Sequence, residues 1–315
     1  MNEISTPQRR TSRRGLIFGG FAAAAIAGGL ATALIVIPGT GRGHVQTQNL
    51  NTQKVSLLAA SVVLGKASDA AAAGPDLKPR PGQYLYFTSK SQQVRNGAQA
   101  ISTSRKAWLS VDGKRPGLLD QTENGNRMYV WLCDSSAKKG PEGDPKVNLG
   151  KPPTNCQAQQ PAYDPTIPTD ANAAKTWLYR HSVGGNPPDV QAFITVGDTI
   201  RERYLGSRPL AALFKAAAQI PGVKVYPHVT DLAGRTGIGV GQTYGGVRQE
   251  LIFDPKTYKL IGEQQVSDDD TSFHPAWKNP KDVGGKQPAV GPNGQVIYSS
   301  AVLGFGVVNR PGQLP

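Results

Sequence analysis

The sequence is poor in the side chains that most catalytic and metal sites require. Its 315 residues include two cysteines and four histidines, and no two histidines lie at a metal-ligand spacing such as HxxxH. There is no CxxC pair for redox chemistry and no GxSxG turn for a hydrolase. The acidic run 268–270, which precedes His274, has the composition of a solvated loop. We therefore expect neither an enzyme nor a bound cofactor or metal.

Dense clusters of basic residues are also missing beyond the N-terminal tip. The chain carries a formal charge of +13. The tip accounts for +3, so the remainder holds +10, from 31 basic and 21 acidic side chains. Basic and aromatic residues are not interleaved as in nucleic-acid-binding segments, so we expect no nucleic acid partner. Dispersed positive charge can still attract a protein to anionic lipid headgroups or acidic wall polymers.

One stretch near the N-terminus has no charge at all. From Gly15 to Pro38 the chain is dominated by Ala, Leu, Ile, Phe and Gly. At about 1.5 Å per residue, such a helix covers the roughly 30 Å hydrocarbon core of a bilayer. The arginines just before it stay in the cytoplasm, because moving them through lipid is costly; they are Arg9, Arg10, Arg13 and Arg14. The sequence thus predicts a cytoplasmic basic tip (1–14), a transmembrane signal-anchor (15–38) and a single-pass protein of the cell membrane with its C-terminal domain outside.

Three alternatives for this segment remain open. A cleaved secretory signal has a shorter apolar region that ends in small residues, whereas here the run ends in bulky residues, and the small residues Ala31 and Ala33 lie inside it. The segment from Ser12 to Ile17 resembles a twin-arginine export signal. A buried helix of a soluble domain is the third alternative. We favour the uncleaved signal-anchor, because the apolar run is long.

The two cysteines, Cys133 and Cys156, both follow the predicted span. An even pair in an oxidising compartment most simply forms a disulfide, and the alternative is two free thiols. The bond would close a loop rich in Lys, Gly, Pro and Asn, and loop closure of this length contributes about 3 kcal/mol in chain-entropy terms.

The rest of the chain divides into a flexible linker (39–55), rich in polar residues, and an extracytoplasmic domain (56–315). Hydrophobic periodicity and turn residues place an Ala-rich helix first, then strands, a block of three helices and a β meander. The expected helices are 56–73, about 169–179, about 189–204 and about 207–220. The expected strands are 83–88, 105–111, 127–133, 223–229, 236–243, 247–253, 260–266 and 296–308. Strands that flank a block of helices indicate an α+β fold in which a curved antiparallel sheet packs on several helices. The glycines of 237–241 lie within a strand, so they ease sheet curvature or packing and do not form a phosphate loop.

Aromatic residues concentrate in the first three predicted strands. The set consists of Tyr84, Tyr86, Phe87, Trp108, Tyr129 and Trp131; the candidate groove residues are these without Phe87. Tyr84 and Tyr86 share one strand face, as do Tyr129 and Trp131. One interpretation is that these residues belong to an ordinary hydrophobic core. The functional alternative is that they line one wall of an apolar groove between the sheet and its helices.

Several motifs resemble an actinobacterial family of single-span membrane proteins, often encoded beside extracytoplasmic-function sigma factors. The motifs cover 81–86, 167–170, 220–223, 229–235, 247–255 and 299–303. The resemblance implies a fold similar to that of lipoprotein carriers and of the sensor domains that regulate anti-sigma factors, with a curved antiparallel sheet wrapped around helices. The motifs are structural turns, so no catalytic residue follows from them. The cytoplasmic tip is too short to form a sigma-binding domain.

These observations predict a membrane-anchored extracytoplasmic binding or sensing domain. Its partners would be the lipid bilayer, through the N-terminal helix, and an apolar or lipid-like ligand or a regulatory protein partner in envelope signalling. The alternative is a structural envelope protein whose basic surface contacts anionic lipids or wall polymers. An enzyme is the third choice.

Overall fold

The computed structural model describes residues 48–94, 100–133, 152, 156, 160–201, 203–270 and 291–315. The predicted tip (1–14) and membrane span (15–38), with Arg9, Arg10, Arg13 and Arg14, lie outside these residues. Within the described ranges, no helix is long and apolar enough to cross a membrane.

The described chain is α+β, as the sequence predicts, with nine antiparallel strands in one sheet and four helices. The helices are α1 (Gln48–Ala73), α2 (Ala171–His181), α3 (Pro188–Arg201) and α4 (Ser207–Ala217). The first strands are β1 (Tyr84–Gln93), β2 (Ile101–Ser110), β3 (Gly117–Glu123) and β4 (Asn126–Leu132). The others are β5 (Lys224–Thr230), β6 (Thr236–Tyr244), β7 (Val247–Phe253), β8 (Leu260–Ser267) and β9 (Val296–Val308).

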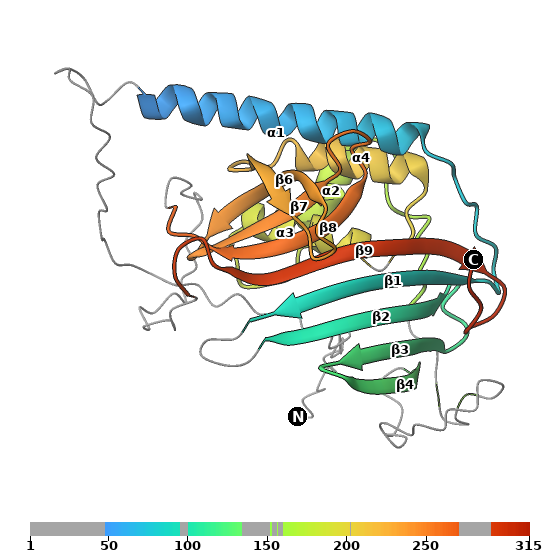
Figure 1. Cartoon of the computed structure of the whole chain (residues 1–315). Helices are drawn as coiled ribbons and strands as arrows, with labels where there is room; N and C mark the ends of the chain where they lie inside the picture. Colours follow the sequence, from blue (N-terminus) through green and yellow to red (C-terminus); the bar gives the residue numbers. More distant parts are fainter. Residues whose placement is uncertain are drawn as a thin grey trace, which may run out of the picture.

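The sheet joins two meanders through β9. Its order is β4-β3-β2-β1-β9-β8-β7-β6-β5, so β9 pairs with β1 on one side and with β8 on the other. In Figure 1, β9 (red) runs between the β1–β4 strands and the β6–β8 strands, with α1 and α4 lying along the opposite side of β6–β8. The strand that unites the sheet therefore follows all the others in sequence.

The helices cover one face of the sheet, which we call the helix face. A single apolar core fills the space between them and the β5–β8 half, and Leu64 of α1, Leu178 of α2 and Leu213 of α4 are fully buried in it. From the sheet, Leu251 and Phe253 reach this core, as expected for alternate residues of one strand. Burying each large aliphatic or aromatic side chain contributes about 1.5–3 kcal/mol.

Turn residues end the strands where the sequence predicts. Asn124 and Gly125 both have positive φ, as do Gly245 and Gly246, which is the backbone of the two-residue hairpins favoured by strand twist. The Asp254 carboxylate accepts hydrogen bonds from the backbone N–H groups of Lys256 and Thr257, at 3.0 and 2.7 Å.

Residues 229–235 form a turn whose Arg235 side chain joins strands β8 and β9. Asp231 is buried, accepts from the Arg235 backbone N–H at 2.9 Å and forms an ion pair with the Arg235 guanidinium at 2.5 Å. The same guanidinium donates to the carbonyl oxygens of Ile261 in β8 and Val302 in β9, at 2.8 and 2.9 Å. This turn thus binds two neighbouring strands of the sheet.

Two elements differ from the sequence-based expectation. Helix α1 begins at Gln48 rather than Ser56, within the stretch assigned to a flexible linker. Strand β3 was not predicted, because its sequence GLLDQTE combines two leucines with polar residues and has no β-branched or aromatic run. Pairing with β2 and β4 on either side stabilises β3, which is a tertiary effect.

The predicted disulfide is present. Cys133, just after β4, is bonded to Cys156, with Cα atoms 4.8 Å apart. The bond ties the edge of the β1–β4 meander to the chain that leads into α2. Residues nearer α2 continue along the sheet, since the Ala162 N–H donates to the Ser110 carbonyl at 3.0 Å.

Candidate functional site

Three regions of the described chain gather polar or aromatic side chains. They are a charged network on β6–β8, a polar pocket between α2 and α3, and two aromatic groups on opposite faces of β1 and β9. Within the described ranges, no group of His, Cys, Asp or Glu could hold a metal ion.

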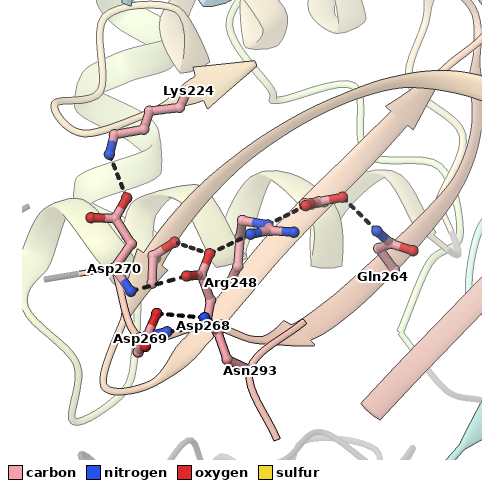
Figure 2. Close-up of polar contacts among 9 residues, drawn as sticks. Lys224, Arg248, Gln264, Asp268, Asp269, Asp270 and Asn293 are labelled. Atoms are coloured by element: carbon pink, nitrogen blue, oxygen red, sulfur yellow. Dashed lines mark hydrogen bonds and ion pairs between the residues drawn. The ribbon is translucent and has the colours of Figure 1, made fainter. Parts of the chain in front are cut away.

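The charged network centres on Arg248 of β7. Its guanidinium pairs with the carboxylates of Glu250 and Asp268. Gln264 donates to Glu250 at 2.7 Å and Thr243 donates to Asp268 at 3.2 Å. Figure 2 shows Arg248 beside Asp268, with Gln264 on its other side. Each carboxylate therefore has a charged partner and a neutral one, which a buried charge requires.

The acidic run continues this network to the surface. Asp270 pairs with Lys224 of β5 at 2.6 Å, and Asp269 accepts from the Asn293 side chain at 2.7 Å (Figure 2). The solvated loop expected for 268–270 is therefore partly incorrect, since Asp268 is buried beside Arg248. The Asp268 backbone N–H donates to the Gly246 carbonyl at 3.0 Å, which holds the end of β8 against the β6–β7 hairpin and buries the carboxylate.

Glycines in β6 make room for the network. Gly237, Gly239 and Gly241 lie on the face opposite the helices, which we call the far face. A side-chain carbon at Gly239 would approach Val229 and Glu250 to 2.8 and 2.9 Å. Side chains of β5 and β7 close over these glycines, which agrees with the predicted role in packing.

Burial controls the electrostatics here. It raises the pKa of Glu250, and the nearby Arg248 guanidinium opposes this shift. It also raises the pKa of Tyr226 to about 12. The Arg248 guanidinium lies over the Tyr226 ring, 4.1 Å from its centroid. The network is thus tightly paired, and its main chemical consequence is to hold β5–β8 together.

The pocket between α2 and α3 has a volume of about 250 Å³. Trp177 stacks on His181, with ring centroids 4.4 Å apart, and Thr195 and Asp198 lie on the facing helix. This volume is below the roughly 300–1,000 Å³ typical of ligand sites. The pocket is polar and small, so it does not fit an acyl chain.

The structure brings the five predicted aromatic residues together, but not in the predicted groove. Tyr86 pairs with Trp108, their rings 5.3 Å apart, and Tyr84, Tyr129 and Trp131 join the same cluster. Leu85, between the two tyrosines, packs instead against Tyr204, which follows α3 on the helix face. Since alternate residues point to opposite faces, the five aromatics lie on the far face.

A different aromatic group lies on the helix face of β1 and β9. The Phe87 and Phe305 rings are 4.9 Å apart, and Tyr204 stacks on Phe305 at 5.6 Å. A bulge in β9 shifts the register, so Val302 pairs with Ser89 and Phe305 with Phe87. Val302 and Phe305, three residues apart, therefore share one face, which an unbulged strand does not allow.

We call Phe87, Val302, Phe305 and Tyr204 the helix-face strip. Phe305 is 37% exposed and Val302 38% exposed, whereas the core under the helices is closed. Tyr204 is fixed in place, since its hydroxyl accepts from the Leu77 N–H at 2.7 Å and donates to Asp76. The strip was not predicted from the sequence, because strict alternation along β9 would place Val302 and Phe305 on opposite faces of the sheet.

No protein-family model matches the chain, and no curated protein matches it. Among solved structures, the chain is similar to one in the complex of MucA and MucB from Pseudomonas aeruginosa, with 11% sequence identity and a TM-score of 0.27. The similarity covers 82% of this chain and 58% of that chain, so it spans less than two thirds of the matched protein. A TM-score of 0.27 carries no argument about function.

Proposed function

We propose that this protein is a membrane-anchored extracytoplasmic domain that binds an apolar, lipid-like ligand, and that the helix-face strip is the contact surface. The observation that carries the proposal is the partial exposure of Val302 and Phe305 beside the Phe87 ring. Apolar side chains that gather on one part of a surface can mark a site for lipids or proteins.

The strip has the features of a binding surface rather than of an unfinished core. Tyr204 forms its floor, and both hydrogen bonds of the Tyr204 hydroxyl are made within the domain. Burial and the bond to Asp76 raise the pKa of Tyr204 to about 12, so its ionisation is even less favourable than that of a free tyrosine. A rigid neutral aromatic surface binds acyl or aromatic groups at low entropic cost.

The membrane location rests on the charge-free segment 15–38 and the arginines before it. An enzyme-reporter fusion at the C-terminus, active only outside the cytoplasm, tests this location. Activity of a cytosol-specific reporter at the same position would overturn it.

Ligand binding is tested with the full-length chain in detergent. Mass spectrometry should detect a co-purified lipid, and an apolar fluorescent dye should bind and be displaced by that lipid. Phe305→Asp should weaken dye binding by about tenfold or more, because burying a phenylalanine contributes about 1.5–3 kcal/mol. The matched control is Val183→Asp, since Val183 is 68% exposed away from the strip. Equal losses in the two variants would contradict the proposal.

A further inference from the structure

The far face of the sheet carries a second aromatic surface, separate from the helix-face strip. We call it the aromatic face: Tyr84, Tyr86, Trp108, Tyr129 and Trp131. Leu118 of β3 and Val308 of β9 lie between these rings and complete the cluster. The four described helices pack on the opposite face, yet Tyr84, Tyr86 and Trp108 are buried, so other parts of the chain cover them.

The last residues of the given chain lie on this face. The Trp108 indole N–H donates to the Gln313 carbonyl at 2.6 Å. The Pro315 ring lies over Gly306 of β9, where an added side-chain carbon would be only 2.5 Å from the proline Cγ. Gly306 faces Tyr86 in the register of the sheet, so the proline sits beside the aromatic rings.

A short turn presents this segment to the sheet. The Gln313 N–H donates to the Arg310 carbonyl at 3.3 Å, and Gly312 between them has a φ of 82°. Trp108 and Tyr86 are buried where this segment lies, whereas Leu314 of the segment is 59% exposed. The segment lies on the surface and is not part of the core.

These contacts combine two features of proline recognition. Aromatic rings bind the flat pyrrolidine ring, and an indole N–H satisfies a backbone carbonyl of an extended segment that loses little entropy on binding. Proline itself supplies a carbonyl and no N–H, so it can bind through its ring and through the carbonyl groups of its segment. In this protein, Trp108 supplies the donor and residues 310–315 supply two prolines, Pro311 and Pro315.

The aromatic face extends beyond the part that residues 310–315 contact. Tyr129 and Trp131 are only partly buried. The indole nitrogen of Trp131 has no hydrogen-bond partner within the described part of the chain. That nitrogen is buried, so a segment longer than six residues would cover more of the Tyr129 and Trp131 rings without reaching it.

We propose that the aromatic face is a docking site for a proline-containing segment of a protein partner, and that residues 310–315 occupy this site in cis. The partner segment displaces residues 310–315 and takes over the bond to Trp108. This inference is independent of the apolar ligand proposed for the helix-face strip, which lies on the other side of the sheet.

The test uses the full-length protein and a labelled peptide, Arg-Pro-Gly-Gln-Leu-Pro, with binding followed by fluorescence anisotropy. A variant ending at Asn309 should bind this peptide at least tenfold more tightly than the intact chain, because the competing segment is gone. A peptide with alanine in place of both prolines should bind the variant at least fivefold more weakly. Equal binding of the two peptides would overturn the proposal.

A substitution on the sheet locates the site. In the variant ending at Asn309, Trp108→Phe keeps an aromatic ring but removes the indole donor, and should weaken peptide binding about tenfold. Trp177→Phe is the matched control, since Trp177 lies on α2, on the other side of the sheet; it should leave binding unchanged. Equal effects of the two substitutions would overturn the assignment.

A second variant tests the proposal in case the shortened chain does not fold. If that chain does not fold, as judged by circular dichroism, Pro311→Ala with Pro315→Ala in the intact chain weakens the cis contact and should likewise increase peptide binding. Absence of peptide binding by a folded variant at millimolar concentration would refute the docking site.

Discussion

The two halves of the sheet are stabilised in different ways. In the β5–β8 half, helices bury one face, and paired charges close over glycines on the other. In the β1–β4 half, a disulfide secures the edge, and some apolar side chains on each face, such as Trp131 and Phe305, stay partly exposed. The first half is closed by charges and by helices, and the second holds the two surfaces that we propose as binding sites. Four measurements test whether the two halves differ in this way.

The largest effect is expected at Arg248. Arg248→Ala leaves the buried carboxylates of Glu250 and Asp268 without their cation, which should destabilise the protein by about 3–5 kcal/mol in urea unfolding. The control is Arg127→Ala in the other half, where Arg127 is 65% exposed in its pair with Asp120 and the expected loss is below about 1 kcal/mol. Similar losses in both variants would remove the contrast.

The disulfide should matter next. Replacing both cysteines (Cys133→Ser with Cys156→Ser) should lower the free energy of unfolding by about 3 kcal/mol, because the open loop regains conformational entropy in the unfolded state. Native-state hydrogen exchange should speed up in β3 and β4 and stay unchanged in β6 and β7. Faster exchange throughout the sheet would show that the halves are not independent.

A smaller loss is expected when the glycine surface of β6 is filled. A methyl group at Gly241 would overlap the Gln249 carbonyl oxygen, so Gly241→Ala should cost about 1–3 kcal/mol in thermal or urea unfolding. Gly65→Ala is the control, since Gly65 lies in α1 with open space around it, and alanine there should stabilise the helix by about 0.5–1 kcal/mol. If Gly241→Ala were neutral, β6 would be less tightly packed than the structure indicates.

The smallest effect concerns pH. Because burial raises the pKa of Glu250, the folded state holds this proton more tightly than the unfolded state does. Between the unfolded and folded pKa values, this group therefore makes stability fall as the pH rises. Glu250→Gln removes that dependence. The unfolding free energy of the variant, minus that of the original protein, should therefore increase as the pH rises through this window. A difference that does not change with pH would contradict the shift.

Most of the second half was predictable from local patterns. The strands from 223 to 266 alternate and are separated by Asp-, Gly- and Pro-containing turns, and the structure places β5–β8 within one or two residues of the expected bounds. Strand β3 was not predictable, since its residues have weak strand propensity and depend on their neighbours in the sheet. The placement of the aromatic residues also needed the register, because periodicity shows which side chains share a face but not which face the helices cover.

The sequence by itself determined the α+β class, the disulfide pair, the hairpin turns and the grouping of aromatic residues, because these depend on nearby residue types and on period-two alternation. The tertiary structure alone decided that β9 joins the two meanders, that a bulge places Val302 and Phe305 on one face, and that residues 310–315 cover Trp108. Each of these depends on contacts between residues far apart in the chain, or on one extra residue in a strand, and neither is visible in a local pattern.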